Sequence, residues 1–173
     1  MLKSILIYGG ILAVTFILRF VLVALVDHLE AKLKERKNPS PFWLPLLLAF
    51  LTFIAGVLIV AQISTPILWI LSRWDIVYGV VLMFAILAAA AVGTYMSFAA
   101  LQDMRKYGTK KKLHYVTAII FFLYMDWILD LAAVSLVTAF DFSDLIRAVL
   151  NVSFFTVYTV YLIVLLVKSL KST

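Results

Sequence analysis

The chain has 173 residues, of which 65% are hydrophobic and only 14% are charged. A soluble domain of this size cannot bury so much apolar surface, so the composition predicts an integral membrane protein. The formal net charge is +6, but the basic residues gather at the ends of apolar runs, a pattern that orients membrane proteins and does not indicate nucleic-acid binding. The chain has no cysteine, which excludes a disulfide framework and a thiolate metal site.

The first apolar run, residues 4–26, is long enough to cross a hydrocarbon core about 30 Å thick. We interpret it as a retained crossing because it is longer than the apolar part of a signal peptide and no small-residue cleavage site follows. Residues 27–37 place Glu30 and Lys34 one turn apart, so we expect them to continue this helix as a cytoplasmic stalk. The sequence Asn-Pro-Ser-Pro at 38–41 is expected to end it.

The next run, residues 42–74, would be about 50 Å long as one helix, which is too long for a single crossing without steep tilt. We therefore expect a break between Gln62 and Pro66, because Thr65 is a suitable N-cap and proline is favoured at the first helical position. This division predicts a crossing at 43–62 and a separate interfacial helix at 66–74 on the outer surface, where tryptophan and arginine suit the headgroup zone.

Three further crossings are expected at 77–102, 113–140 and 145–167, which completes an all-α bundle of five transmembrane helices in a single domain. Five crossings divide the basic residues between the two sides of the membrane, and one side has only three of them: Lys3, Arg73 and Arg147. The positive-inside rule therefore predicts an external N-terminus and a cytoplasmic C-terminus, in a plasma membrane or bacterial inner membrane. The basic residues of the expected cytoplasmic side are Lys32, Lys34, Arg36, Lys37, Arg105, Lys106, Lys110, Lys111, Lys112, Lys168 and Lys171.

One stretch of the expected cytoplasmic side contains enough basic residues to attract anionic lipid headgroups. Each basic residue near the surface contributes about 1 kcal/mol to such binding. The simpler alternative is that this stretch only determines topology, with incidental lipid contact. The residues concerned are Arg105, Lys106, Lys110, Lys111 and Lys112.

Small residues repeat at every fourth position of the 77–102 segment and should form one shallow face. Such a face lets a neighbouring backbone approach closely, which is a main source of helix association in lipid. We favour a partner inside the bundle over a second copy, with Gly9, Gly10 and Ala13 as one candidate surface. The small residues are Ala85, Ala89, Gly93 and Ser97.

Two carboxylates, Asp126 and Asp130, lie one helical turn apart within the 113–140 segment. An intramembrane acid is costly unless it is protonated, paired or hydrated, so it marks a candidate functional site. The short connection 141–143 predicts an antiparallel hairpin. Counting symmetrically from this connection places Asp130 near Asn151 and Ser153, and Asp126 beside Thr156 and Tyr158.

Two interpretations of the acid pair stay open: it locks the hairpin through hydrogen bonds, or it binds a proton or cation. Arg19 is a third ionisable residue within a predicted crossing. Its side chain is expected either to extend to cytoplasmic phosphates or to reach inward and neutralise Asp126.

Several enzyme classes lack their required residues. Intramembrane aspartyl proteases need facing aspartates on two helices, whereas Asp126 and Asp130 lie on one, and the serine-hydrolase, zinc-protease and phosphate-loop motifs are missing from the sequence. A divalent metal would need more oxygen ligands than this pair supplies. We therefore expect no metal or cofactor and favour a non-enzymatic protein.

The sequence Asp126-Trp127-x-x-Asp130, followed by Ser135, Asp141, Ser143 and Arg147, resembles a segment of small phage- or prophage-type membrane proteins whose function is mostly unassigned. That segment reads Asp-Trp-x-x-Asn and lies near the end of those proteins, so the chain departs from it at Asp130. The resemblance implies a viral or accessory-gene origin and assigns no activity.

The leading hypothesis is a membrane accessory or interaction protein whose partner is a second copy or another membrane protein. The first alternative is a small proton- or cation-linked transporter or channel that uses Asp126 and Asp130. Against it stand the lack of an internal repeat and of Gly/Pro-broken helices in matching positions. The second alternative, a phage-type lysis or exclusion protein, depends on the resemblance.

Overall fold

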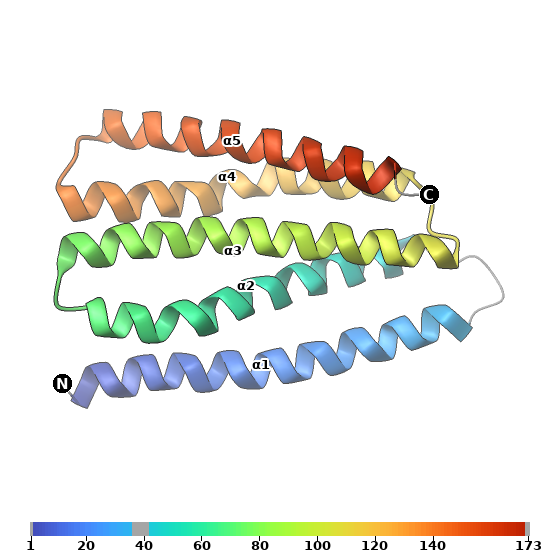
Figure 1. The fold of residues 1–173 in the computed structure, drawn as a ribbon, viewed down its shortest axis with the longest axis horizontal. Coiled ribbons are helices and arrows are strands. Elements are labelled where there is room, and N and C mark those ends of the chain that lie inside the picture. Colours follow the sequence, from blue (N-terminus) through green and yellow to red (C-terminus); the bar gives the residue numbers. More distant parts are fainter. Residues whose placement is uncertain (1, 36–41, 172–173) are drawn as a thin grey trace.

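Long helices joined by short turns form the part of the chain that the computed structural model describes, residues 2–35 and 42–171 (Figure 1). Five of these helices are long and apolar enough to cross a membrane. The all-α five-helix prediction is thereby confirmed. The elements in chain order are α1 (Leu2–Glu35), α2 (Trp43–Leu71), α3 (Asp75–Met104), the short 3-10 helix η1 (Arg105–Tyr107), α4 (Lys112–Phe140) and α5 (Asp144–Lys171).

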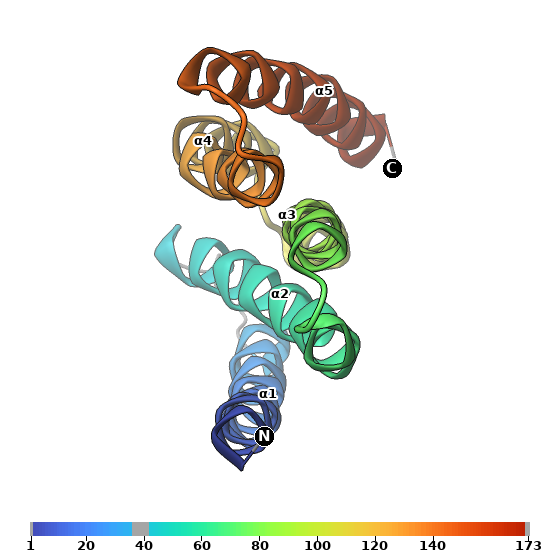
Figure 2. The same cartoon turned by 90° about the vertical axis from the view of Figure 1, so that its left-hand side faces the viewer.

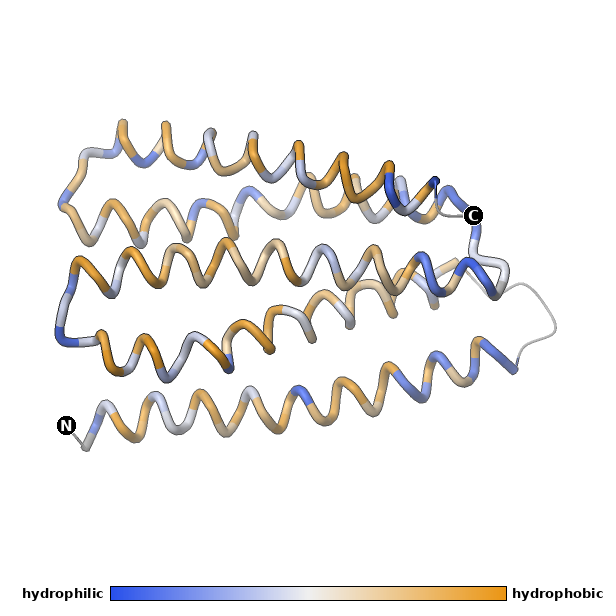
Figure 3. The backbone as a smooth tube through the Cα atoms, viewed as in Figure 1, coloured by the Kyte–Doolittle hydropathy of each residue, from blue (hydrophilic) through white to orange (hydrophobic). Residues whose placement is uncertain are grey.

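The helices lie in space in their chain order, as the end-on view in Figure 2 shows. Each α-helix packs against the next one along the chain, and α5 also contacts α3. The α1 and α4–α5 layers therefore form opposite edges of the molecule. Figure 3 shows apolar helices with hydrophilic residues concentrated at their ends, and isolated hydrophilic positions inside α1, α4 and α5.

The expected break in the second apolar run is wrong, because α2 continues through Pro66 to Leu71. Pro66 has no N–H to bond to the carbonyl of Gln62, four residues earlier, a loss that transmembrane helices tolerate. In the same turn the hydroxyls of Ser64 and Thr65 donate to the carbonyl of Ala61, at 3.3 Å and 2.6 Å. The separate interfacial helix at 66–74 is therefore absent, and α3 begins at Asp75.

The expected stalk is helical as far as the structure describes it, because α1 runs without interruption to Glu35. Lys34 pairs with Glu30 at 3.1 Å, and Leu33 packs in a buried cluster with Leu44 and Leu48 of α2. The stalk is thus part of the bundle. Its residues 36–37 and the expected stop at 38–41 lie outside the described residues.

Small residues bring α3 close to both of its neighbours. A Cβ atom on Gly93 would lie 2.9 Å from the carbonyl oxygen of Phe53, and one on Gly56 would lie 2.8 Å from the Cα atom of Gly93. Ser97 donates a hydrogen bond to the carbonyl of Ala49. The small-residue face therefore packs inside the bundle, against α2.

The prediction that Gly9 and Gly10 of α1 pack against the small-residue face is wrong, since a Cβ atom on either glycine would meet no atom within 4 Å. Ala85 and Ala89, the other members of the predicted face, are half-buried. Gly79, which the sequence pattern did not single out, faces α4: its Cβ would lie 2.8 Å from the carbonyl oxygen of Ser135.

Candidate polar site between α4 and α5

Two pairs of polar side chains join α4 to α5, and both pairs have the same spacing. Asp126 and Asp130 are separated by one turn of α4, and Arg147 and Asn151 by one turn of α5. Because the two helices are antiparallel, this spacing produces two parallel cross-links, Asp130 with Arg147 and Asp126 with Asn151. We call these four residues the polar face.

The Asp130–Arg147 contact is a bidentate ion pair. The Nε atom of Arg147 donates to Oδ1 of Asp130 at 3.1 Å, and Nη2 donates to Oδ2 at 2.5 Å. The side chains are only partly buried, with 31% of Asp130 and 43% of Arg147 exposed. This planar two-bond geometry is the strongest form of arginine–carboxylate recognition, and it neutralises the charge of Asp130 within the chain.

Asp126 is compensated far less. Asn151 donates one hydrogen bond to its Oδ1 atom at 3.2 Å, while Oδ2 has no hydrogen-bond partner in the described part of the chain. Asp126 is exposed, although it lies midway between Lys112 and Phe140 on α4. A neutral amide donor leaves the charge of a carboxylate unbalanced, so Asp126 is the charged residue of the polar face that needs a further partner.

The partners expected for the two acids are wrong in part. Asn151 bonds to Asp126 and not to Asp130, while the hydroxyls of Ser153 and Thr156 donate to the carbonyls of Val149 and Val152 in their own helix. Tyr158 is buried and contacts Thr94 of α3 at 2.7 Å between their hydroxyl oxygens.

The geometry of the connection explains this shift in register. Asp141 ends α4 in the left-handed conformation, with φ 54°, and the N–H of Phe142 bonds to the carbonyl of Val137 at 3.0 Å. This helix ending makes the connection asymmetric. In Figure 1 α4 extends beyond the start of α5, so α5 begins level with a point inside α4 and not with its end. Arg147 was missed as a partner, although its charge and its spacing from Asn151 match the acid pair.

Arg19 does not pair with Asp126, one of its two expected partners. Its Nη1 atom donates to Oε1 of Gln62 on α2 at 2.9 Å. Asp126 belongs to α4, which lies on the far side of α2 and α3 from α1 (Figure 2). No ion pair joins Arg19 to a carboxylate of the described residues.

The basic tract at the other end of the bundle is partly used for packing. Arg105 donates to the carbonyl of Ser169 at 2.9 Å, and Lys106 pairs with Asp103 at 3.6 Å. The fully buried His114 contacts the hydroxyl of Ser169 at 3.0 Å, a contact that the sequence pattern did not indicate. Lys110, Lys111 and Lys112 remain exposed.

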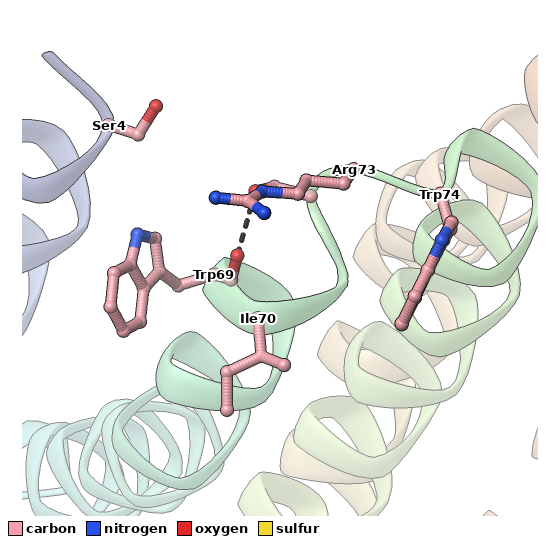
Figure 4. Close-up of a pocket in the computed structure, with 6 residues that line it drawn as sticks. Ser4, Trp69, Ile70, Arg73 and Trp74 are labelled. Carbon is pink, nitrogen blue, oxygen red and sulfur yellow. Dashed lines mark hydrogen bonds between the residues drawn. The ribbon is translucent and has the colours of Figure 1, made fainter. Parts of the chain in front are cut away.

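A concave region, separate from the polar face, lies at the α2–α3 turn (Figure 4). This pocket has a volume of ≈ 560 Å³. Tryptophan and arginine at the end of apolar helices are typical of the membrane–water interface, and the region therefore fits a position near the headgroups. The lining residues are Ser4, Trp69, Ile70, Ser72, Arg73 and Trp74.

No protein-family model, curated protein or solved structure matches this chain. The resemblance around Asp126 and Trp127 therefore stays a prediction. Within residues 2–35 and 42–171, no three His, Asp or Glu side chains form a group that could hold a metal ion.

Proposed function

We propose that the chain is a non-enzymatic multi-pass membrane protein that acts by binding another membrane-embedded protein at the polar face. The observation that carries this proposal is the exposed carboxylate of Asp126 in the middle of an apolar helix. Intramembrane charges almost always face protein or water. A protein partner with a hydrogen-bond donor would satisfy Oδ2 of Asp126, which lipid chains cannot do.

The neighbouring aromatic residues support a protein contact. Trp127, the residue after Asp126, is 80% exposed and presents a large flat surface near the acid; Tyr124 is 70% exposed on another side of α4. Tryptophan, tyrosine and arginine are the residues that most often dominate the binding energy of protein interfaces. Transport by Asp126 and Asp130 ranks lower in this proposal, because Arg147 already supplies the counter-charge of Asp130.

A photo-crosslinking residue in place of Trp127 tests this function in native membranes. We expect protein adducts at this position, and we expect Asp126→Leu to remove most of them. A crosslinker in place of Phe84, which is 61% exposed on α3, is the matched control and should give lipid adducts only. Lipid adducts alone at both positions would contradict the proposal, as would wild-type cation flux that disappears in Asp126→Asn.

We further propose that the N-terminus is external and the C-terminus cytoplasmic, with Lys110, Lys111 and Lys112 near anionic lipid headgroups. The distribution of basic residues supports this orientation. Basic side chains occur in the last turn of α1, in η1 and in the last turn of α5, and these three segments lie at one end of the bundle (Figure 1). A reporter fused after Thr173 should be cytoplasmic and one fused before Met1 external. A cytoplasmic reporter at Met1 would contradict it.

A further inference from the structure

We propose that the partner of the polar face is a second copy of this chain, whose Arg19 on α1 pairs with Asp126 on α4 of its neighbour. This inference rests on the proposed function, because it identifies the membrane-embedded protein that binds there. Each copy then carries one donor edge, α1, and one acceptor edge, the polar face.

The first step is that α1 has little contact with the rest of its own chain. In the most apolar stretch of α1 only 6% of the residues are buried, compared with 44% in α2. Of the large apolar residues near Arg19, Phe16 is 48% exposed and Phe20 is 72% exposed. One long face of α1 is therefore open to a neighbour.

The second step is charge. Arg19 lies near the middle of α1, where it has a neutral hydrogen-bond acceptor, Gln62, and no carboxylate from the described residues. Asp130 and Arg147 neutralise one another. Arg19 and Asp126 are therefore the two uncompensated charges in the middle of the described helices, and they have opposite sign. Leaving either in hydrocarbon costs several kcal/mol, so pairing them is favourable.

The third step is depth in the membrane, and we compare the depths of the two charges by the α3 residues that lie level with them. Gly56 of α2 faces Gly93 of the antiparallel α3, so Gln62, six residues after Gly56, lies near the level of Leu87. The guanidinium of Arg19, which is bound to Gln62, lies at the same level. Gly79 faces α4 at Ser135 and Ala139, which places Asp126 between the levels of Ala88 and Val92. At 1.5 Å per residue the two charges differ in depth by at most about 8 Å, which a long arginine side chain can span.

The fourth step is geometry. The helices that carry Arg19 and Asp126, α1 and α4, are separated by α2 and α3, so the two side chains cannot meet within one molecule (Figure 2). Copies of a membrane protein share one orientation, so a neighbour displaced sideways brings its α1 edge to the polar face at the matching depth. This contact joins two different surfaces, and it therefore generates a ring or an extended row of copies.

A complementation experiment tests the pairing with the purified full-length chain in phospholipid bilayers. Arg19→Gln keeps Asp126, Asp126→Asn keeps Arg19, and each variant alone lacks one half of the contact. We expect each to self-associate at least about tenfold more weakly than wild type, as when one partner of a desolvated charge pair is removed. An equimolar mixture should form one-to-one heterodimers by single-molecule counting, because each heterodimer keeps one intact pair.

A charge exchange in one chain keeps the test decisive if a single substitution impairs folding. The double variant Arg19→Asp with Asp126→Arg should restore association, and the Nε2 atom of Gln62, which is buried without a partner in the described structure, can donate to the new carboxylate. Wild-type association that persists in both single variants would overturn the pairing. A mixture that stays monomeric would overturn it too.

Disulfide crosslinking tests the proximity directly, because the natural chain contains no cysteine. A Phe20→Cys chain and a Trp127→Cys chain in the same membrane should form a mixed disulfide under mild oxidation, because both positions lie at nearly the same depth. Leu6→Cys with Trp127→Cys is the matched control; Leu6 is similarly accessible, at 68% exposed, but lies near the start of α1. Equal yields from the two combinations would contradict the proposed register.

The outcomes also separate this inference from the proposed function. A monomeric wild type whose position 127 still crosslinks to a different membrane protein would overturn self-association and leave the proposed function standing. A monomeric wild type without protein adducts at position 127 would overturn both.

Discussion

The α2–α3 seam and the outer helix α1 contain the same small residues but use them differently. Gly56 and Gly93 face one another so closely that a Cβ atom on either would overlap its neighbour, whereas Gly9 and Gly10 have no atom within 4 Å of theirs. Small residues permit close approach of two helices, but close approach also needs a small residue opposite and a matching surface around it. The seam has these features and α1 has neither.

This difference indicates where the stability of the bundle comes from. Lipid chains are as apolar as leucine, so helices in a membrane associate mainly through close packing and hydrogen bonds. The seam supplies both, because Ser97 donates to the backbone of Ala49 beside Gly93. By contrast, α1 is attached to α2 at mid-height by Arg19 and Gln62. A change in the seam should therefore destabilise the protein most.

The largest effect is expected for Gly93→Leu, which forces a bulky side chain between α2 and α3. We expect a loss of about 3 kcal/mol or more, or failure to fold, because the neighbouring backbone of Phe53 cannot move away cheaply. Leu87→Ala, at a half-buried position of the same helix, should cost roughly 1–2 kcal/mol. Reversible unfolding in detergent measures both values. Equal losses would show that the seam is not tightly packed.

The sequence allowed the small-residue face to be located but not its partner. The fourfold spacing of Ala85, Ala89, Gly93 and Ser97 follows from helical periodicity alone. The partner depends on which helix brings a complementary surface to the same depth, and Gly9 and Gly10 resemble Gly56 in composition. Similarly, Pro66 suggested a helix start because proline is favoured at the first helical position, but the same residue is also tolerated inside a long transmembrane helix such as α2.

The next largest effect concerns the ion pair of the polar face. Asp130→Asn leaves the guanidinium of Arg147 without its counter-charge, so we expect a clearly lower Tm than wild type. Asp126→Asn should leave Tm almost unchanged in the monomer, because an amide oxygen can still accept the hydrogen bond from Asn151. Exchanging the charges, Asp130→Arg with Arg147→Asp, should recover part of the loss. A similar Tm for both single variants would contradict the assigned pairing.

The sequence identified the two acids but placed their partners incorrectly. Counting through a short connection assumes that both helices end at the same level, whereas Asp141 closes α4 asymmetrically and α5 begins deeper. Opposite charge was the better guide, since Arg147 and Asn151 repeat the spacing of Asp126 and Asp130. The hydrogen bond from Arg19 to Gln62 depends on how α1 packs on α2, which local sequence patterns do not specify.

A smaller effect is expected at the contact between α5 and α3. Tyr158→Phe removes the buried hydroxyl that contacts Thr94 and should cost about 1–2 kcal/mol. The loss should be moderate because Thr94 keeps its bond to the carbonyl of Ala90. Combining this change with Thr94→Val in a double-mutant cycle measures the coupling between the two hydroxyls. Strict additivity would show that they do not interact.

The smallest effect is expected for Gly10→Ala on α1. The added methyl group meets no atom within 4 Å, so the change should only improve helix propensity and raise the stability of the monomer by at most about 1 kcal/mol. Gly79→Ala is the matched control, because its methyl group would lie 2.8 Å from the carbonyl oxygen of Ser135 and should therefore destabilise the protein. Unfolding in detergent at monomeric concentrations measures both changes. A loss at Gly10 as large as that at Gly79 would show that α1 is packed as tightly as the seam, and the open face that the pairing with a second copy requires would then not exist.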